Sequence, residues 1–266
     1  MLERQTLKTL SRDSGLSIDT LKRTFYAILP QAPTVRIIKR KGVNLRVDGT
    51  YFKQFCLICY QDDLDGYTQL IRFSDRENYG EIREDISNLL ALGVHLESIT
   101  TDGDKSILKA IKDAAPEVIV QRCLVHIQRM CLIWLTRYPK HLAGQELRGL
   151  VLQILKIKTA NDRIYWTREF VDWANRHKDY LSEKTFNQDT GRYWYTHKLL
   201  RRSYLTIKRA LPNMFHYITN PSIPNTNNGI EGFFSHLKNH LDLHRGLTIR
   251  NRINFIKWYI YLSNEK

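Results

Sequence analysis

Long apolar runs are absent from the sequence. No stretch of its 266 residues approaches the ~20 consecutive apolar residues that a membrane-spanning helix needs. The first residues, MLERQTLKTLSRDSG, are polar and amphipathic and do not resemble a signal peptide. We therefore expect no membrane partner and a cytoplasmic location.

Cysteine is scarce as well. The chain has four cysteines, Cys56, Cys59, Cys123 and Cys131. In a reducing cytoplasm, thiols stay free or bind metals and do not form disulfides. The sequence therefore indicates no disulfide framework.

Acidic residues are few compared with basic ones. The chain has 27 Asp and Glu against 41 Lys and Arg, which gives a formal net charge of +14. Basic clusters bind phosphate backbones, so this charge favours a nucleic-acid partner over the plainer reading of a basic soluble enzyme. A 42% hydrophobic and 11% aromatic content excludes a disordered chain, and the length fits one large domain with an insertion or two domains.

Two short helices and a linker are predicted at the N-terminus, and no repeat or low-complexity segment occurs in the chain. Residues 1–30 resemble a helix-turn-helix, in which Gly15 ends the first helix and Ser17 caps the second. A plain helical hairpin remains the alternative. Residues 31–42 form a basic linker that directly follows Pro30 and has Pro33 near its start.

From Val43 onward, apolar residues alternate with a period of two, which is typical of strands, instead of the helical period. Three strands with a tight Asp-Gly turn predict an antiparallel meander, and helix, strand, helix and strand follow up to residue 122. This element order matches the ribonuclease-H-like fold, so residues 43–122 are expected to form the first part of a catalytic core.

The rest of the chain has mainly helical periodicity. Residues 123–220 predict an all-helical insertion, and residues 221–266 predict a loop and the two C-terminal helices of the core. The expected fold class is α/β. It combines a ribonuclease-H-like five-stranded mixed sheet and its helices with a large all-α insertion before the late helix that contains Glu231.

Three carboxylates stand at exposed ends of predicted elements. Asp48 ends the first strand, Asp102 ends the fourth, and Glu231 begins the late helix. Each has a structural explanation, namely a turn residue, a helix cap and a charge favoured by the helix dipole. We assign the cap to Asp104, which directly precedes the helical pattern. Together the three suit a pair of divalent cations, since hard oxygen ligands bind Mg²⁺ or Mn²⁺.

Five short stretches carry a family resemblance: VDGTYF, ITTDGD, CLVH, NNGIEGFFSHLK and HRGL. They span most of the chain, from Val47 to Leu247. With a helical insertion before the glutamate helix, they resemble the DDE transposases of bacterial insertion sequences of the Mutator-like group. The resemblance implies that Asp48, Asp102 and Glu231 are the catalytic and metal-binding residues.

The same resemblance implies an activity and partners. Such an enzyme cuts double-stranded DNA at transposon ends and joins them to a target, with two Mg²⁺ or Mn²⁺ ions, as a homo-oligomer on DNA at the nucleoid of a prokaryote. Relatives carry a larger N-terminal DNA-binding region, so the segment 1–30 is expected to be incomplete. The alternatives are a ribonuclease-H-like nuclease without strand transfer and an inactive DNA-binding derivative.

Further residues are candidates for supporting roles. The resemblance matches Cys123 and His126 to a Cys-x-x-His motif that supports the active site, and a packed core pair is the alternative. Lys238 lies seven residues after Glu231 on the same helix face and is a candidate phosphate ligand. A segment that mixes aromatic and basic residues predicts further DNA contacts, with Trp194 as a base-stacking residue or a buried aromatic. The other candidates are basic: Arg192, Lys198, Arg201, Arg202, Lys208 and Arg209.

The sequence argues against two metal-binding motifs, a zinc knuckle and a calcium-binding loop. Cys56 and Cys59 lie on a predicted strand, where residues three apart point to opposite faces, so they do not suit a zinc knuckle. The turn QDDLDG has Arg72 where a calcium loop needs a glutamate.

Overall fold

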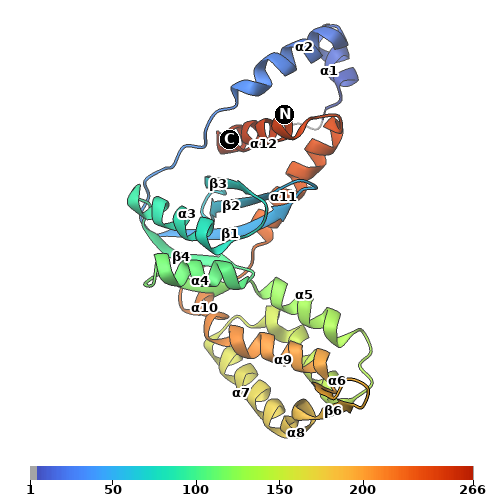
Figure 1. Ribbon diagram of the computed structural model, residues 1–266. Coiled ribbons are helices and arrows are strands. Elements are labelled where there is room, and N and C mark those ends of the chain that lie inside the picture. The colour runs from blue at the N-terminus through green and yellow to red at the C-terminus, as the bar shows by residue number, and fades with distance from the viewer. Residues whose placement is uncertain (1–4, 266) are drawn as a thin grey trace. The chain divides into compact units, whose positions relative to one another are not determined.

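The computed structural model describes residues 5–265 (Figure 1). Residues 1–4 of the expected helix-turn-helix segment and residue 266 lie outside the described part. The chain divides into two compact units. The first comprises the chain up to Ile99, Asp104–Val118 and the chain from Asn227 onward, and the second comprises Thr100–Gly103 and Ile119–Thr226.

Five strands form one mixed sheet in the order β3-β2-β1-β4-β5. They are β1 (Val43–Tyr51), β2 (Cys56–Asp62), β3 (Thr68–Ser74), β4 (Leu96–Thr101) and β5 (Ile119–Arg122). β1 pairs antiparallel with β2, and β2 pairs antiparallel with β3. Alternating apolar and β-branched residues favour these strands. The five-stranded mixed sheet of an α/β fold, with the order of elements along the chain expected for a ribonuclease-H-like fold, is the one predicted from the sequence.

Helices of the first unit begin at well-defined caps. The side chains of Ser17, Asn78 and Thr248 accept backbone N–H bonds at helix starts, and Gly15 ends the first helix with φ of +72°. The helices are α1 (Leu7–Ser14), α2 (Ile18–Ile28), α3 (Tyr79–Ala91), α4 (Lys105–Ala114), α11 (Asn228–Leu241) and α12 (Ile249–Asn264).

The meander is covered by α3 on one face. Tyr60 of β2 donates a hydrogen bond to Asp85 of α3 at 2.9 Å, and Arg72 of β3 forms an ion pair with the same carboxylate. Asp85 is buried, so this pairing compensates for the cost of removing its charge from water. The bonds therefore fix α3 on the meander, beside α4 (Figure 1).

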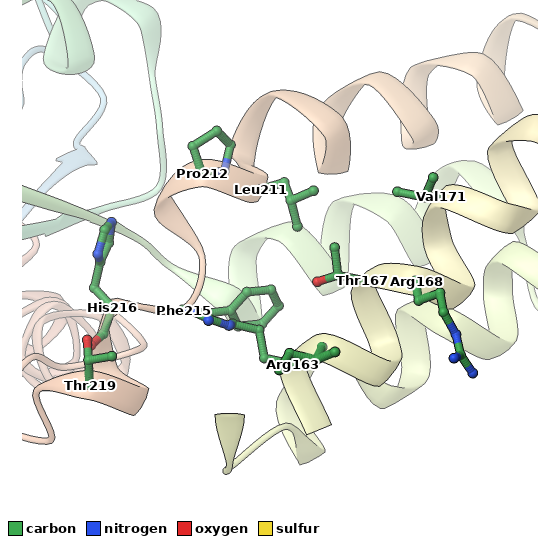
Figure 2. A pocket seen from close by; sticks show the side chains of 10 residues that line it. Arg163, Thr167, Arg168, Val171, Leu211, Pro212, Phe215, His216 and Thr219 are labelled. Carbon is green, nitrogen blue, oxygen red and sulfur yellow. The ribbon is translucent and has the colours of Figure 1, made fainter. Parts of the chain in front are cut away.

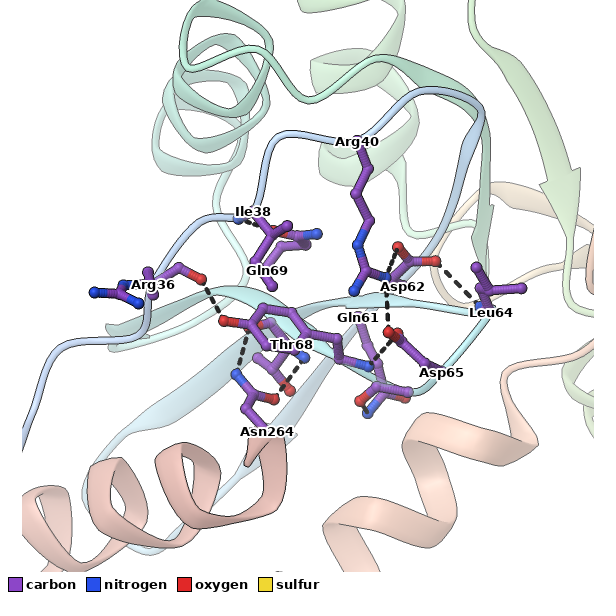
Figure 3. Close-up of polar contacts among 12 residues, drawn as sticks. Arg36, Ile38, Arg40, Gln61, Asp62, Leu64, Asp65, Thr68, Gln69 and Asn264 are labelled. Atoms are coloured by element: carbon purple, nitrogen blue, oxygen red, sulfur yellow. Dashed lines mark hydrogen bonds and ion pairs between the residues drawn. The ribbon is translucent and has the colours of Figure 1, made fainter. Parts of the chain in front are cut away.

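The linker before β1 is bonded to the turn between β2 and β3 (Figure 3). Arg40 forms ion pairs with Asp62 at 3.0 Å and with Asp65 at 2.7 Å. Tyr67 donates its hydroxyl to the carbonyl of Arg36 at 2.6 Å. Asn264, at the end of α12, exchanges two hydrogen bonds with the backbone of Thr68 in the next strand. Both the linker and the last helix are therefore anchored to this end of the sheet.

The second unit contains six helices, α5 (Leu124–Leu135), α6 (Leu142–Gln153), α7 (Ala160–Arg176), α8 (Lys178–Ser182), α9 (Lys198–Ala210) and α10 (His216–Thr219). Its core includes the aromatic rings of Trp166, Phe170 and Trp173. The indoles of Trp166 and Trp173 donate to backbone carbonyls at 2.9 and 3.0 Å, which satisfies their buried N–H groups.

One part of this unit differs from the all-helical expectation. β6 (Lys184–Asn187) and β7 (Arg192–Tyr195) form an antiparallel hairpin. Gly191, with φ of +63°, closes its turn through a bond from its N–H to the carbonyl of Asn187. The turn residues and the alternating aromatics outweigh the helical pattern there.

None of the helices within residues 5–265 is both long and apolar enough to cross a membrane.

Candidate active site

Asp48 lies within β1, three residues before its end at Tyr51, so the prediction that Asp48 ends the strand is wrong. It pairs in register with Cys59 of β2, and Cys59 packs in the same core cluster as Ile230 and Phe234 of α11. Paired residues point to the same face, so Asp48 shares a face with α11. Burial, followed by the charge of Asp48, holds the pKa of the Cys59 thiol well above its usual range.

Glu231 is brought to this strand by the start of α11. The side chain of Asn227 donates to the carbonyl of Val47 at 3.3 Å, and the N–H of Glu231 donates to the carbonyl of Asn227 at 2.9 Å. Glu231 therefore lies one helical turn beyond the residue that fixes α11 to β1. Within the first unit, the structure places the helix that contains Glu231 against the strand that contains Asp48.

Arg46 of β1 lies against Gly229, the second residue of α11. Its guanidinium fills the space that a side chain at Gly229 would need, and it forms an ion pair with Asp63. Arg46 and Asp48 are two apart on β1 and therefore point to the same face. A side chain at Gly229 would therefore displace the end of the Arg46 side chain.

Asp102 directly follows β4, the strand next to β1 in the sheet. Its carbonyl accepts a hydrogen bond from Nη2 of Arg122 at 2.9 Å. The N–H of Cys123 donates to the carbonyl of Thr101 at 2.8 Å. The backbone around Asp102 is therefore held, within the second unit, by the junction of β5 and α5.

Asp104 is the N-cap of α4, as the sequence predicts. Its Oδ1 accepts from the N–H groups of Ser106 at 2.7 Å and Ile107 at 3.4 Å. The cap function is thus carried by Asp104, and Asp102 lies outside the helix.

Arg122 was not among the residues singled out from the sequence. It is 9% exposed, and its guanidinium occupies the space where a side chain at Gly103 would lie. Burial lowers its pKa, an effect that the nearby charge of Asp102 opposes. In the sequence, Arg122 could have been identified from its position directly before the Cys-x-x-His motif.

The Cys-x-x-His motif lies at the start of α5. Cys123 is the fully buried N-cap residue, and His126 is half-buried in the first turn. The backbone bond from Cys123 places the motif beside the strand end that precedes Asp102. The assignment of an active-site supporting role to the two side chains remains a prediction.

A basic pocket lies near Lys238 in the first unit. Its volume is 240 Å³, and Lys238 shares it with Lys53, Arg245 and Arg252. The ammonium of Lys238 lies 5.5 Å from the ring centroid of Phe52. These four cations outnumber the one carboxylate in the lining, that of Asp242, so the pocket suits a phosphate group. Of these four residues, the sequence indicated only Lys238. Arg245 and Arg252 follow it in the C-terminal segment, and Lys53 comes from the loop after β1.

The other candidate DNA contacts lie on β7 and α9. Trp194 is 45% exposed, which excludes the buried-aromatic alternative for this residue. Arg201 is half-buried, with its guanidinium 3.9 Å from the Tyr195 ring centroid and a bond to the carbonyl of Leu181. It therefore has a structural role within the unit. The remaining basic candidates are exposed: Arg192, Lys198, Arg202, Lys208 and Arg209.

Another cavity, of 640 Å³, lies between α7 and the segment before α10 (Figure 2). Arg163, Phe215 and His216 are among its lining residues, and burial lowers the pKa of His216. None of the candidate carboxylates or DNA contacts lines this cavity.

Residues 5–265 contain no close cluster of metal-binding side chains. No three His, Cys, Asp or Glu side chains in that range are grouped closely enough to hold a metal ion. Asp48, Asp102 and Glu231 do not form such a group in this structure, and their carboxylate oxygens are donors of the kind that Mg²⁺ and Mn²⁺ prefer.

The family profile described as "Transposase, Mutator family" matches residues 31–178, more than half of the chain. The chain belongs to the Mutator family of transposases. The match includes Asp48, Asp102 and the Cys-x-x-His motif, and it ends before Glu231. No curated protein matches this Mutator-family chain.

Solved structures give a weaker likeness. One similar chain belongs to the cryo-EM structure of the simian T-cell lymphotropic virus intasome in complex with PP2A regulatory subunit B56 gamma. The identity is 15% and the TM-score 0.23, and the match covers 66% of this chain and 52% of that chain. The Mutator-family chain thus spans about half the length of that neighbour, and a likeness of this size carries no argument about activity.

Proposed function

We propose that the chain is a DDE transposase that cuts double-stranded DNA at the ends of an insertion sequence and transfers the ends to a target. Asp48, Asp102 and Glu231 would hold two Mg²⁺ or Mn²⁺ ions. When bound, such ions stabilise the attacking and leaving oxygens of a phosphodiester in line. The protein would act as a homo-oligomer on DNA.

The observation that carries the proposal is the placement of carboxylates in a Mutator-family core. Asp48 lies on β1, and Asp102 follows the neighbouring strand β4. α11 places Glu231 one turn from the contact between Asn227 and Val47. A carboxylate on β1, one directly after the neighbouring β4 and one on a helix over the same sheet are donors of the kind that phosphoryl transfer by divalent cations requires.

The rest of the chain supplies the binding functions in this proposal. The pocket of Lys53, Lys238, Arg245 and Arg252 would bind backbone phosphates near the end of β1. The exposed basic residues of β7 and α9 would extend the DNA contact, and α1 and α2 would contribute as a helix-turn-helix. Arg122 and the Cys123–His126 motif would position Asp102.

The test compares two aspartates in one loop. Asp102→Asn keeps the side-chain volume but removes the charge that would hold a metal, so Mg²⁺-dependent cleavage and strand transfer should fall by several orders of magnitude. Binding of DNA should persist, since a negative charge near the phosphates is removed.

Asp104→Asn is the matched control. Asn caps a helix about as well as Asp, so this variant should cut DNA at close to the wild-type rate. The readout is cleavage and joining of DNA that carries the element's own ends. If Asp104→Asn abolished cutting and Asp102→Asn did not, the metal-binding aspartate would be Asp104 and not Asp102. Wild-type activity in both variants would refute the proposed chemistry.

A further inference from the structure

A second cavity in the second unit has an aromatic lining. Its volume is 420 Å³, and it lies where the end of α5, the following loop, α8 and the start of α9 meet. Trp134, Tyr138, Tyr180 and His197 line it. The rings of Tyr180 and His197 are stacked, with centroids 3.6 Å apart and an interplanar angle of 16°. Pockets of this size accommodate small organic ligands.

Aromatic rings at this cavity are exposed to solvent. Tyr138 is 77% exposed, although aromatic side chains usually bury most of their area. His141 lies within 5.7 Å of Tyr180 and 5.8 Å of His197, measured between ring centroids. The cavity therefore offers ring faces on which a planar ligand can stack.

A buried polar atom gives a second, independent observation. The hydroxyl of Tyr180 is buried and makes no hydrogen bond within residues 5–265. A buried hydroxyl without a partner costs free energy, and a ligand edge that carries donors and acceptors would satisfy it. Burial also raises the pKa of Tyr180, so the phenol stays protonated and able to donate.

The charge of the lining defines the ligand further. Lys140 and Lys198 are exposed at the cavity, and the described residues that line it include no acidic one. Glu183, beside the lining, contacts Nε2 of His197 at 2.9 Å. The guanidinium of Arg202 lies 4.3 Å from the ring centroid of Trp134. A ligand that combines a flat aromatic ring with negative charge fits this lining. Nucleotides have both features, and stacking on aromatic residues is how proteins bind unpaired bases.

We propose that this cavity binds a single base turned out of a DNA duplex, with Lys140 and Lys198 contacting the flanking phosphates. The inference rests on the proposed function for its substrate class, DNA. It assigns base stacking to Trp134, Tyr138 and His197, none of which the sequence indicated, in addition to the exposed Trp194.

The experiment uses two duplexes that differ at one position. In one, 2-aminopurine is paired with thymine, and in the other it is unpaired. Binding is measured by fluorescence anisotropy, and stacking by quenching of 2-aminopurine, in EDTA so that no cleavage occurs. The wild-type protein should bind the unpaired duplex about tenfold more tightly and quench its fluorescence, as expected for one stacked base.

Two tyrosine variants make a matched pair. Tyr138→Ala removes an exposed ring from the cavity and should lose most of the tenfold preference. Tyr165→Ala removes a ring that is 57% exposed on α7, outside the cavity, and should keep it. Circular dichroism confirms that both variants fold. Lys140→Gln is a second variant. It should bind DNA more weakly, since it loses a phosphate contact, but should still quench the fluorescence of 2-aminopurine.

Two outcomes would overturn the inference: equal affinity of the wild-type protein for both duplexes, or equal behaviour of the two tyrosine variants. An apolar cavity that serves a protein partner would give the first outcome. Failure of the proposed transposase chemistry would instead appear as absent cleavage in Mg²⁺, with the binding preference intact. The two failures are therefore distinguishable.

Discussion

Gly103 follows the candidate catalytic Asp102 with a backbone φ of +90°, a conformation that residues with a side chain rarely adopt. The guanidinium of Arg122 also fills the space beside it. Any side chain at this position would strain the backbone and displace Arg122, which donates to the carbonyl of Asp102. Gly103 therefore fixes the geometry of the residue before it.

Substitution of this glycine tests that geometry. Gly103→Ala should lower the free energy of unfolding by about 1–2 kcal/mol because of its positive φ. It should also reduce cleavage through the shift of Arg122 and Asp102. Gly149→Ala, in the interior of α6 with open space around it, should instead raise stability by up to about 1 kcal/mol.

Chemical denaturation and Mg²⁺-dependent cleavage, measured on both variants, check this prediction. A Gly103→Ala protein as stable and active as the wild type would show that the loop tolerates a side chain. It would also show that Arg122 has no positioning role.

At the scale of elements, α3 is attached to the meander by one buried carboxylate. Asp85 accepts from Tyr60 and pairs with Arg72, and the bond to Asp85 raises the pKa of Arg72. Asp85→Ala should lower the free energy of unfolding by about 3 kcal/mol or more, since it leaves a partly buried guanidinium without its main partner. Thermal and urea unfolding would measure the loss.

The control lies one residue earlier on the same helix. Glu84 also pairs with Arg72, but its side chain is 61% exposed. Exposed ion pairs contribute at most about 1 kcal/mol, so Glu84→Ala should have a small effect. Equal losses in the two variants would mean that burial does not determine the strength of this network.

The core elements were predictable because local patterns determine them. Alternation of apolar residues identifies β1 to β3, and cap residues such as Ser17 and Asp104 mark helix starts. The hairpin of β6 and β7 was missed, although Asn187 and Gly191 carry a turn signal, because aromatic and basic residues at mixed spacing also fit a helix. Local periodicity therefore identifies elements reliably only where one period dominates.

Sites made from distant segments were less accessible to sequence reasoning. Asp48, Asp102 and Glu231 stand out because each occurs at the end or beginning of a predicted element. Lys53 and Arg252 are separated by most of the chain and share a pocket only after folding. The aromatic cavity of the second unit likewise combines residues from three segments, 134–144, Tyr180 and 196–200, which meet only after folding.

At the scale of the whole molecule, charge is the dominant property. The net charge of +14 includes a row of exposed cations on α9, where Lys198, Arg202 and Arg209 lie on one helix face. The double variant Arg202→Gln/Arg209→Gln should bind DNA more weakly and reduce the slope of log affinity against log salt by about 2, one unit for each lost phosphate contact.

Two exposed lysines elsewhere in the second unit provide a control of equal charge. Lys156→Gln/Lys158→Gln should leave the slope close to that of the wild type. A titration of DNA binding at several salt concentrations separates the cases. Equal reductions in both double variants would indicate that net charge alone, without a defined contact surface, determines the affinity.

The bonded linker before β1 would fix the distance along DNA between the base pairs that α1 and α2 contact and the base pairs that are cut. Arg36, Ile38 and Arg40 are each tied to the β2–β3 turn or to the start of β3, so the segment between α2 and the sheet is not a free tether (Figure 3). If α1 and α2 read a sequence near the element's end, the number of base pairs between the position read and the position cut is fixed by the folded chain. Added linker residues would bulge outward from these bonds and leave that spacing unchanged.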